Sequence, residues 1–359
     1  MLDKNNITEL IKNEESTILP IYFPSPLYYS LNSALNLAMI LTNPETHKWF
    51  VNCFLQLAFN KDYPNDPLLH PLDIYPANMV RLNRHGETLF KHESTVDIDG
   101  VMIEDKPEEL INRVKRWLRG GFYVLSLKFD VTKLKGTKWY GKKPFMHDVL
   151  CFGYDDEKKA FKFLDFDDRG GQLAIIDISY DDFYNATYSP IVKQHIFYLI
   201  MTKKTATYEF NFELYKMFIY DYINSINTEK KYIHITGSRG EYWWGLGIYE
   251  PFIEFVDYCA VNRNEIKYKA FHALYEHKKC LVMSYEYLTT NNIICKDDAI
   301  YNELNIIMDK ANDLKALVLK YNHSKNKELL VKIKNYLREI FILEKETLNK
   351  FFGIISRYN

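Results

Sequence analysis

The chain has 359 residues, with 46 Lys and Arg balanced by 47 Asp and Glu, and 47% of its residues are hydrophobic. A formal charge of −1 provides no overall attraction for phosphate backbones, so we expect no nucleic acid partner. The N-terminus lacks the apolar core of a signal peptide, and no window approaches about 18 uncharged apolar residues. These features predict a cytoplasmic protein that does not enter the membrane.

Three helices are predicted in the first third of the chain. A Pro-rich stretch ends at Ser30, which is placed to cap an apolar helix over residues 31–41. A second helix is expected over residues 45–59. Pro107 opens a third helix, which has acidic residues in its first turn and basic residues in its last, and Gly120 ends it.

Alternating β-branched and aromatic runs follow, separated by turns rich in Asp and Gly. Four of these runs lie between residues 122 and 179, and a further strand is expected over residues 194–201. Joined by short turns, they predict an antiparallel meander. From about residue 207 the apolar spacing becomes helical. We therefore predict an α+β chain with one domain at residues 1–205 and a helical domain at residues 206–359.

Two polar residues stand at positions that suit nucleophilic catalysis. His147 opens one predicted strand, and Asp165 lies on the next strand along the chain. In papain-like catalysis a nucleophile at a helix start gives its proton to a histidine, which a third polar group orients. Either residue also has a structural explanation: His147 as a buried strand histidine bonded to the backbone, and Asp165 as a turn residue.

The segment HDVLCFGYDDEKKAFKFLDFDD, which begins at His147, resembles the histidine-containing hairpin of C39-like, papain-fold proteins related to the N-terminal domain of butirosin biosynthesis protein H. The segment YYSLNSALNLA is similar to the nucleophile helix of that family. The resemblance implies a papain-like core followed by a helical half. It also implies transfer of an acyl group from a carrier-protein thioester to a small amine, without a cofactor or metal, in a bacterial natural-product pathway.

Ser30 departs from the family pattern, which has cysteine at this position. A substituted cysteine, a natural serine nucleophile and an inactive relative each explain the serine. A helix start lowers the pKa of a thiol enough to ionise it, but it does not do so for a serine hydroxyl. Ser30 would therefore depend on His147 as a general base, and its simplest structural role is that of a helix cap.

Other candidate sites fit less well. Cys151 follows His147 by four residues on one strand, which separates them by roughly 13 Å. Cys53 is expected in the core, where cysteine packs as a small apolar residue. The spacing of His70, His85 and His92 matches no standard zinc pattern. The Gly-rich stretch at residues 236–251 is expected to be a long loop or a lid over the active site.

Three functions remain open on these residues. The first is an acyltransferase or amide synthase that uses residue 30, His147 and Asp165. The second is a peptidase or thioesterase, in which water accepts the acyl group at the same site. The third is a non-catalytic scaffold, which the serine at position 30 favours. The second donor of the oxyanion hole is not identified, and Tyr22, Tyr28 and Tyr29 are candidates by proximity in the sequence.

Overall fold

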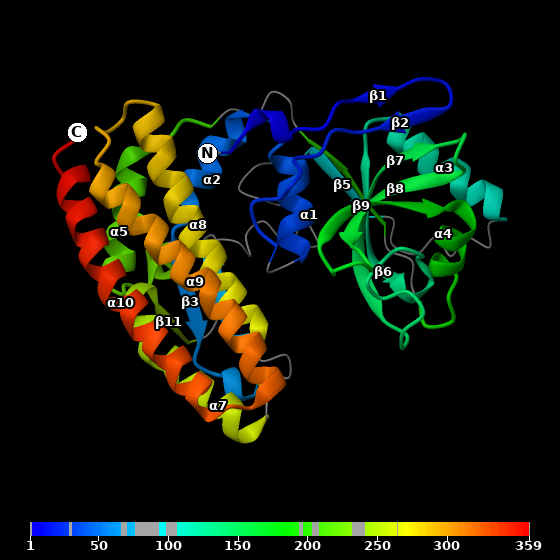
Figure 1. Ribbon diagram of the computed structural model, residues 1–359. Coiled ribbons are helices and arrows are strands. Elements are labelled where there is room, and N and C mark those ends of the chain that lie inside the picture. Colours follow the sequence, from blue (N-terminus) through cyan, green and yellow to red (C-terminus); the bar gives the residue numbers. More distant parts are fainter. Residues whose placement is uncertain are drawn as a thin grey trace. The chain divides into compact units, whose positions relative to one another are not determined.

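The computed structural model describes residues 2–28, 31–65, 70–75, 93–97, 106–193, 197–202, 208–231, 241–263 and 265–358 (Figure 1). The chain divides into two compact units. The sheet unit comprises Asp3–Thr46 and Val80–Thr207. The helical unit comprises Met1–Leu2, His47–Met79 and Tyr208–Asn359. The helical unit therefore includes a segment near residues 47–79 that the sequence assigned to the first domain.

Among the described residues, the sheet unit is built on an eight-stranded antiparallel sheet, and the five strands predicted between residues 122 and 201 all belong to it. Its path runs β1-β2-β7-β6-β10-β5, and β8 pairs with both β7 and β9. The strands are β1 (Ile11–Lys12), β2 (Ser16–Ile18), β5 (Glu93–Asp97), β6 (Tyr123–Asp130), β7 (Met146–Asp155), β8 (Ala160–Phe166), β9 (Leu173–Ser179) and β10 (Phe197–Met201). Strand β7 is central, because it pairs with β8 along one edge and with β6 and β2 along the other.

Among the described residues, three α-helices belong to this unit: α1 (Leu31–Ile40), α3 (Pro107–Arg119) and α4 (Tyr180–Thr187). Helix α3 begins at proline, as predicted, and buries Leu110, Val114 and Leu118, which recur every four residues along one face. Gly121 follows it with φ of +88°, a conformation that glycine adopts readily. Residues of α1, α3, α4 and both faces of the sheet share one hydrophobic core.

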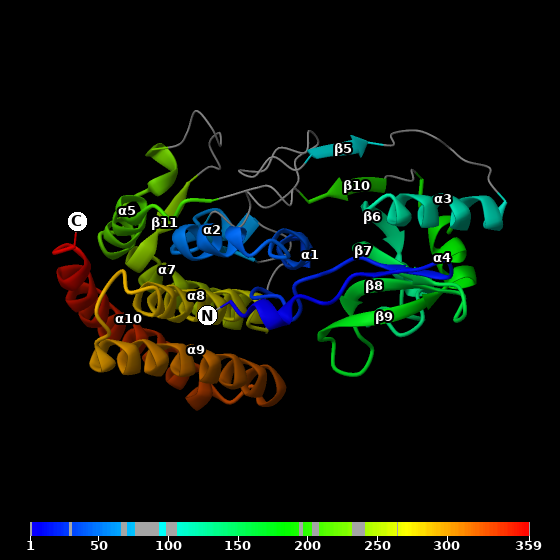
Figure 2. The same cartoon turned by 90° about the horizontal axis from the view of Figure 1, so that it is seen from above.

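The described part of the helical unit contains five long helices that follow residue 208, together with most of α2 (Glu45–Cys53). The five helices are α5 (Phe212–Ile223), α7 (Tyr249–Asn262), α8 (Tyr268–Thr290), α9 (Asp298–Ser324) and α10 (Lys327–Ile355). Helices α8 and α10 both pack along α9 (Figure 2). The predicted helical C-terminal half is confirmed, and the chain as a whole is of mixed α and β structure.

A small sheet in the helical unit corrects the prediction of one helix over residues 45–59. Helix α2 ends at Cys53, and β3 (Gln56–Asn60) pairs with β4 (Leu72–Tyr75) and β11 (Tyr242–Trp244). The segment after Cys53 is apolar at nearly every position, so periodicity does not distinguish a buried strand from a buried helix. Strand β3 forms because β11, about 180 residues further along the chain, supplies its second neighbour.

Candidate functional site

Helix α1 forms where the sequence predicts the nucleophile helix. Its side chains Ala34, Leu35, Ala38 and Met39 are buried in the core of the sheet unit. The carbonyl oxygen of Ala38 accepts a hydrogen bond from the backbone N–H of Tyr22, which fixes the preceding loop against the helix. Ser30 lies immediately before α1 and is outside the described residues, as is Tyr29.

His147 lies near the start of β7, as predicted, and is half-buried. It pairs with Phe129 on β6. Its ring lies against two aromatic side chains of the preceding loop, with centroid distances of 5.4 Å to Phe145 and 6.4 Å to Trp139. The imidazole therefore has apolar neighbours along part of its surface, which limit the directions from which solvent or a substrate reaches it.

Asp165 lies on β8 and is fully buried, with 0% of its surface exposed. Its Oδ1 accepts a hydrogen bond of 2.7 Å from the backbone N–H of Phe166, whereas its Oδ2 has no hydrogen-bond partner among the described residues. Burial raises the pKa of this carboxyl to about 7, and the neighbouring charge of Asp148 adds to the shift. A buried carboxyl oxygen without a donor is costly and uncommon in folded proteins.

The sheet brings His147 and Asp165 to the same face of adjacent strands. Leu150 lies opposite Leu164. Continuing this register places Asp165 opposite Val149, and His147 is two residues further along β7 on the same face. Such diagonal neighbours are typically about 7–8 Å apart. The two side chains do not share a hydrogen bond in this structure, because Oδ1 of Asp165 is bonded to Phe166 and Oδ2 to no described group.

Four of the five cysteines are buried, and these four show no feature of an activated thiol. Cys53 is buried as predicted, and burial raises the pKa of its thiol to about 12. Cys151 is also buried, its pKa is raised by desolvation, and its thiol donates to the carbonyl oxygen of Gly153. Burial raises the pKa of Cys259 to about 11 and that of Cys280 still further. None of these four provides a thiolate near neutral pH.

Three further sequence predictions concern the Gly-rich stretch, the histidines and Tyr22. Residues 241–251 do not form a lid, because β11 is part of the small sheet and Trp244 is buried. Residues 236–240 lie outside the described residues, as do His85 and His92. The hydroxyl of Tyr22 accepts hydrogen bonds from the backbone N–H of Asp3 and the side chain of Asn6, so it is engaged by the N-terminal turn.

A buried polar cluster in the helical unit was not identified from the sequence. Lys278 of α8 and Glu344 of α10 are both fully buried, and Lys278 Nζ lies 2.6 Å from Glu344 Oε1. The hydroxyls of Tyr222 and Tyr249 donate to the same carboxylate over 3.0 and 2.5 Å. No local motif signals this cluster, because its members come from four helices that are distant in the sequence.

His277 extends this cluster to the small sheet. Its Nδ1 lies 3.2 Å from Lys278 Nζ, and its Nε2 lies 3.0 Å from the carbonyl oxygen of Leu55. Because a lysine ammonium only donates, Nδ1 accepts and Nε2 carries the proton. Burial and the adjacent Lys278 charge hold the pKa of His277 well below its usual range. The imidazole is therefore neutral and serves to fix α8 to the chain before β3.

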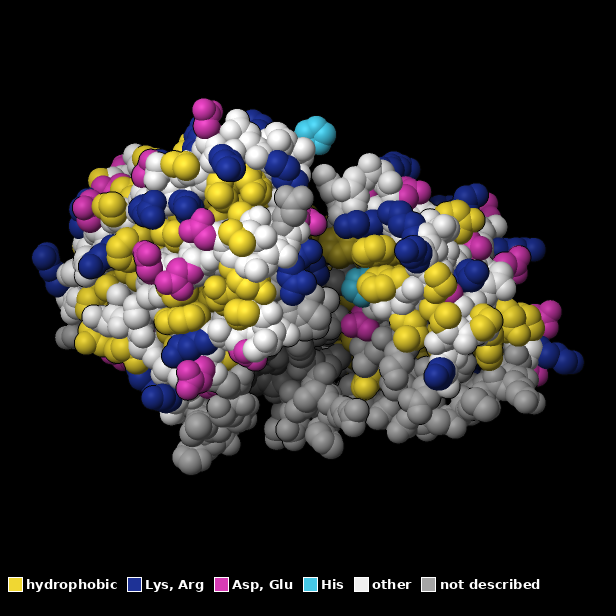
Figure 3. All heavy atoms as spheres, turned by 90° about the horizontal axis from the view of Figure 1, so that it is seen from below, with side chains coloured by type: hydrophobic (Ala, Val, Ile, Leu, Met, Phe, Trp, Pro, Cys, Tyr) yellow, Lys and Arg dark blue, Asp and Glu magenta, His cyan; other side chains and the backbone are white. Residues whose placement is uncertain are grey.

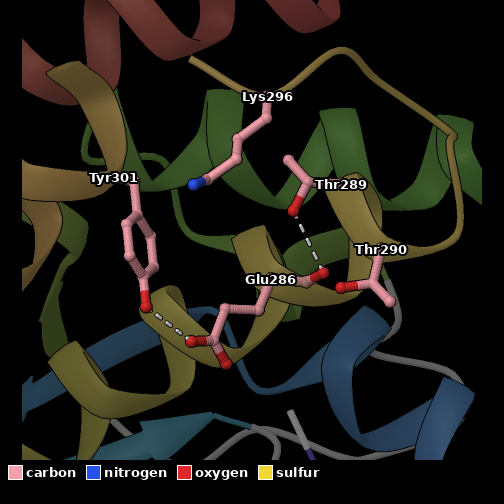
Figure 4. A pocket seen from close by; sticks show the side chains of 5 residues that line it. All are labelled: Glu286, Thr289, Thr290, Lys296 and Tyr301. Atoms are coloured by element: carbon pink, nitrogen blue, oxygen red, sulfur yellow. Dashed lines mark hydrogen bonds between the residues drawn. The ribbon is translucent and has the colours of Figure 1, made fainter. Parts of the chain in front are cut away.

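A surface pocket of about 510 Å³ lies in the helical unit and is lined by Glu286, Thr289, Thr290, Lys296 and Tyr301 (Figure 4). Its polar groups are engaged within the fold. The Tyr301 hydroxyl donates to Glu286 over 2.8 Å, Thr289 donates to main-chain carbonyl oxygens, and Lys296 pairs with Asp298 at 2.6 Å. The pocket thus offers few unsatisfied groups for recognition of a ligand.

Comparison with known proteins adds no relative: neither a family model nor a curated protein matches this chain. Within the described parts of the chain, no helix has the length and apolar character required to cross a bilayer.

Proposed function

We propose that the chain is a papain-like acyltransferase that forms amides from carrier-bound acyl thioesters. The observation that carries this proposal is Asp165, a fully buried carboxyl on the same sheet face as His147, one of whose oxygens has no donor among the described residues. Ionisable groups with strongly shifted pKa values cluster at functional sites. The order of helix α1, His147 and Asp165 along the chain is that of the family which the sequence resembles.

The reaction proceeds in two balanced steps. In the first, the side chain of residue 30 attacks the thioester carbonyl carbon while His147 accepts its proton. The carbon–sulfur bond breaks, and His147 returns that proton to the departing carrier thiolate. In the second step an amine attacks the acyl-enzyme, His147 accepts the amine proton, and this proton passes to the side chain of residue 30 as it leaves. The product is an amide.

Asp165 acts on His147 and not on the substrate. A carboxylate that accepts from one imidazole nitrogen fixes the tautomer and stabilises the imidazolium formed in each step. In the present structure the two groups are not hydrogen-bonded, so the proposal requires that they approach when substrate binds. Catalytic hydrogen bonds are often long or poorly aligned before the substrate complex forms.

Two observations favour a second candidate, a non-catalytic scaffold. Position 30 is serine, and Asp165 does not bond to His147. A hydrolase would use the same residues with water as acceptor. The hydrolase would release the free acid, whereas the acyltransferase would release an amide.

The test uses the Ser30→Cys variant with an acyl-pantetheine thioester and a panel of small amines, and separates products by mass. Amide formation that is lost in the Ser30→Cys/His147→Ala double variant supports the proposal. Release of the acid alone identifies a hydrolase, and unchanged thioester identifies a scaffold.

A further inference from the structure

Five lysines lie in one segment that leads into the candidate base. They are Lys133, Lys135, Lys138, Lys142 and Lys143, and all five are exposed. No Asp or Glu occurs between Val131 and His147. We refer to these five lysines as the cationic patch. A run of lysines alone is typical of any solvated surface, but three further features distinguish this one.

Within the described parts of the chain, no acidic side chain neutralises the cationic patch by an ion pair. None of its five ammonium groups forms an ion pair with a described residue. The turn between β8 and β9, which contains two aspartates, is hydrogen-bonded to this segment through main-chain groups. The backbone N–H of Lys138 donates to the carbonyl oxygen of Phe166, and the backbone N–H of Asp168 donates to that of Gly136. Asp167 of this turn accepts from the N–H groups of Gly170 and Gln172, which hold its pKa below its usual range. The turn also carries Asp168 and Arg169, so its formal charge of −1 offsets only one of the five lysine charges.

Exposed apolar side chains accompany the lysines. Tyr140, Phe145 and Met146 are 48%, 39% and 44% exposed, and all three belong to the same segment. Phe145 also contacts the ring of His147, so this apolar surface reaches the candidate site. On the surface of the sheet unit, Lys and Arg side chains lie beside hydrophobic ones (Figure 3). Charged groups that surround exposed apolar side chains are typical of surfaces that bind proteins.

The side chain of Trp139 lies beneath two lysines of the cationic patch. Lys138 and Lys142 lie over its ring, at 5.3 and 5.7 Å from the centroid. Its indole N–H is buried and has no acceptor among the described residues. A buried donor without an acceptor is costly, and the cost is removed if a bound partner reorders this segment and supplies one.

We infer that the cationic patch docks an acidic protein that carries the acyl thioester, and so delivers the thioester to the site at His147. This inference rests on the proposed function. A small acyl donor gains little from five lysines, whereas an acidic protein gains a higher association rate from them. The near-neutral charge of the whole chain argues against a general polyanion binder.

The test compares one acyl group on two donors, an acidic acyl-carrier protein and free pantetheine, both with the Ser30→Cys enzyme. The Lys142→Glu/Lys143→Glu variant reverses two charges of the patch. Its control is Lys158→Glu/Lys159→Glu, which makes the same change in the turn at the far end of β7. We expect kcat/KM with the carrier donor to fall roughly tenfold in the patch variant only, and with the pantetheine donor to change less than about twofold.

The inference is overturned if both donors lose activity equally, or if the control variant loses as much as the patch variant. If the Ser30→Cys enzyme processes neither donor, the proposed function fails, and the docking surface is tested separately by fluorescence anisotropy of the labelled carrier protein. Binding that weakens in the patch variant and at higher salt then supports it. Absence of binding, or preferential binding of a single-stranded oligonucleotide, contradicts it.

Discussion

Asp165 of the sheet unit and Glu344 of the helical unit are both fully buried carboxyls, but their surroundings differ. Both oxygens of Glu344 accept hydrogen bonds, from Lys278 and two tyrosines. Within the described parts of the chain, one oxygen of Asp165 has a main-chain donor and the other has none, and the pKa of this carboxyl is raised to about 7. Burial alone therefore does not mark a functional acid. The degree to which the fold satisfies the charge separates a structural carboxylate from a candidate catalytic one.

The largest expected effect comes from removing the partner of Glu344. Lys278→Met leaves a buried, uncompensated carboxylate, and we expect it to lower the free energy of unfolding of the helical unit by about 3–5 kcal/mol. Denaturant unfolding followed by circular dichroism measures this loss. The double variant Lys278→Met/Glu344→Leu should recover most of it. A single variant as stable as the wild type would contradict a buried ion pair between Lys278 and Glu344.

A smaller loss of stability is expected at Gly245, whose main chain lies close to that of Tyr222 in the buried polar cluster. An added Cβ at Gly245 would lie 2.1 Å from the carbonyl oxygen of Tyr222, and Gly245 has φ of +54°. Gly245→Ala should therefore cost about 2–3 kcal/mol through overpacking and backbone strain. The matched control is Gly353→Ala in α10, where an added Cβ meets nothing within 4 Å. That variant should gain about 0.5–1 kcal/mol, and equal losses at both sites would contradict the close approach of Gly245 to the main chain of Tyr222.

The Asp165→Asn variant tests the second buried carboxyl through the pH dependence of the protein's stability. Because the pKa of Asp165 is raised from 3.8 to about 7, its contribution to stability is fully present below pH 3.8 and is lost as pH rises through 7. Asparagine carries no charge, so the variant should be more stable than the wild type at pH 8 by about 1–3 kcal/mol, with no such gain at pH 4. Thermal unfolding across this pH range measures the difference.

The control for this variant is Asp168→Asn, at an exposed position in the next turn, which should shift stability by less than about 0.5 kcal/mol at either pH. A stabilisation by Asp165→Asn that is equal at pH 4 and pH 8 would contradict the raised pKa. It would indicate a packing effect.

The smallest effect is expected at an exposed ion pair. Lys310 Nζ lies 2.7 Å from Glu339 Oε2, and their side chains are 30% and 52% exposed. Lys310→Met should cost about 0.2–1 kcal/mol, because water screens both charges. Comparison of this loss with the loss in Lys278→Met isolates the effect of burial, because both ion pairs are formed by a lysine and a glutamate. Comparable losses for the two variants would refute the contrast between buried and exposed pairs.

The sequence predicted most of the elements, because their signals are local. Pro107 and the charges of α3 mark its bounds, and the Asp and Gly turns mark the antiparallel strands. The segment after Cys53 was assigned to a helix because its strand depends on β11, which is distant in the chain. For the same reason Lys278 and Glu344 carried no signal. His147 and Asp165 were identified by order and resemblance, whereas the missing hydrogen bond between them depends on side-chain geometry that no sequence pattern specifies.

Intact-protein mass spectrometry tests the central claim most directly. The Ser30→Cys variant is incubated with an acyl-pantetheine thioester, alone and with the added substitution His147→Ala. We expect an adduct of one acyl group on the Ser30→Cys protein when His147 is present and a strong reduction when it is absent. An adduct that is unaffected by His147→Ala, or no adduct on either variant, would contradict the assignment of a papain-like site to β7 and β8.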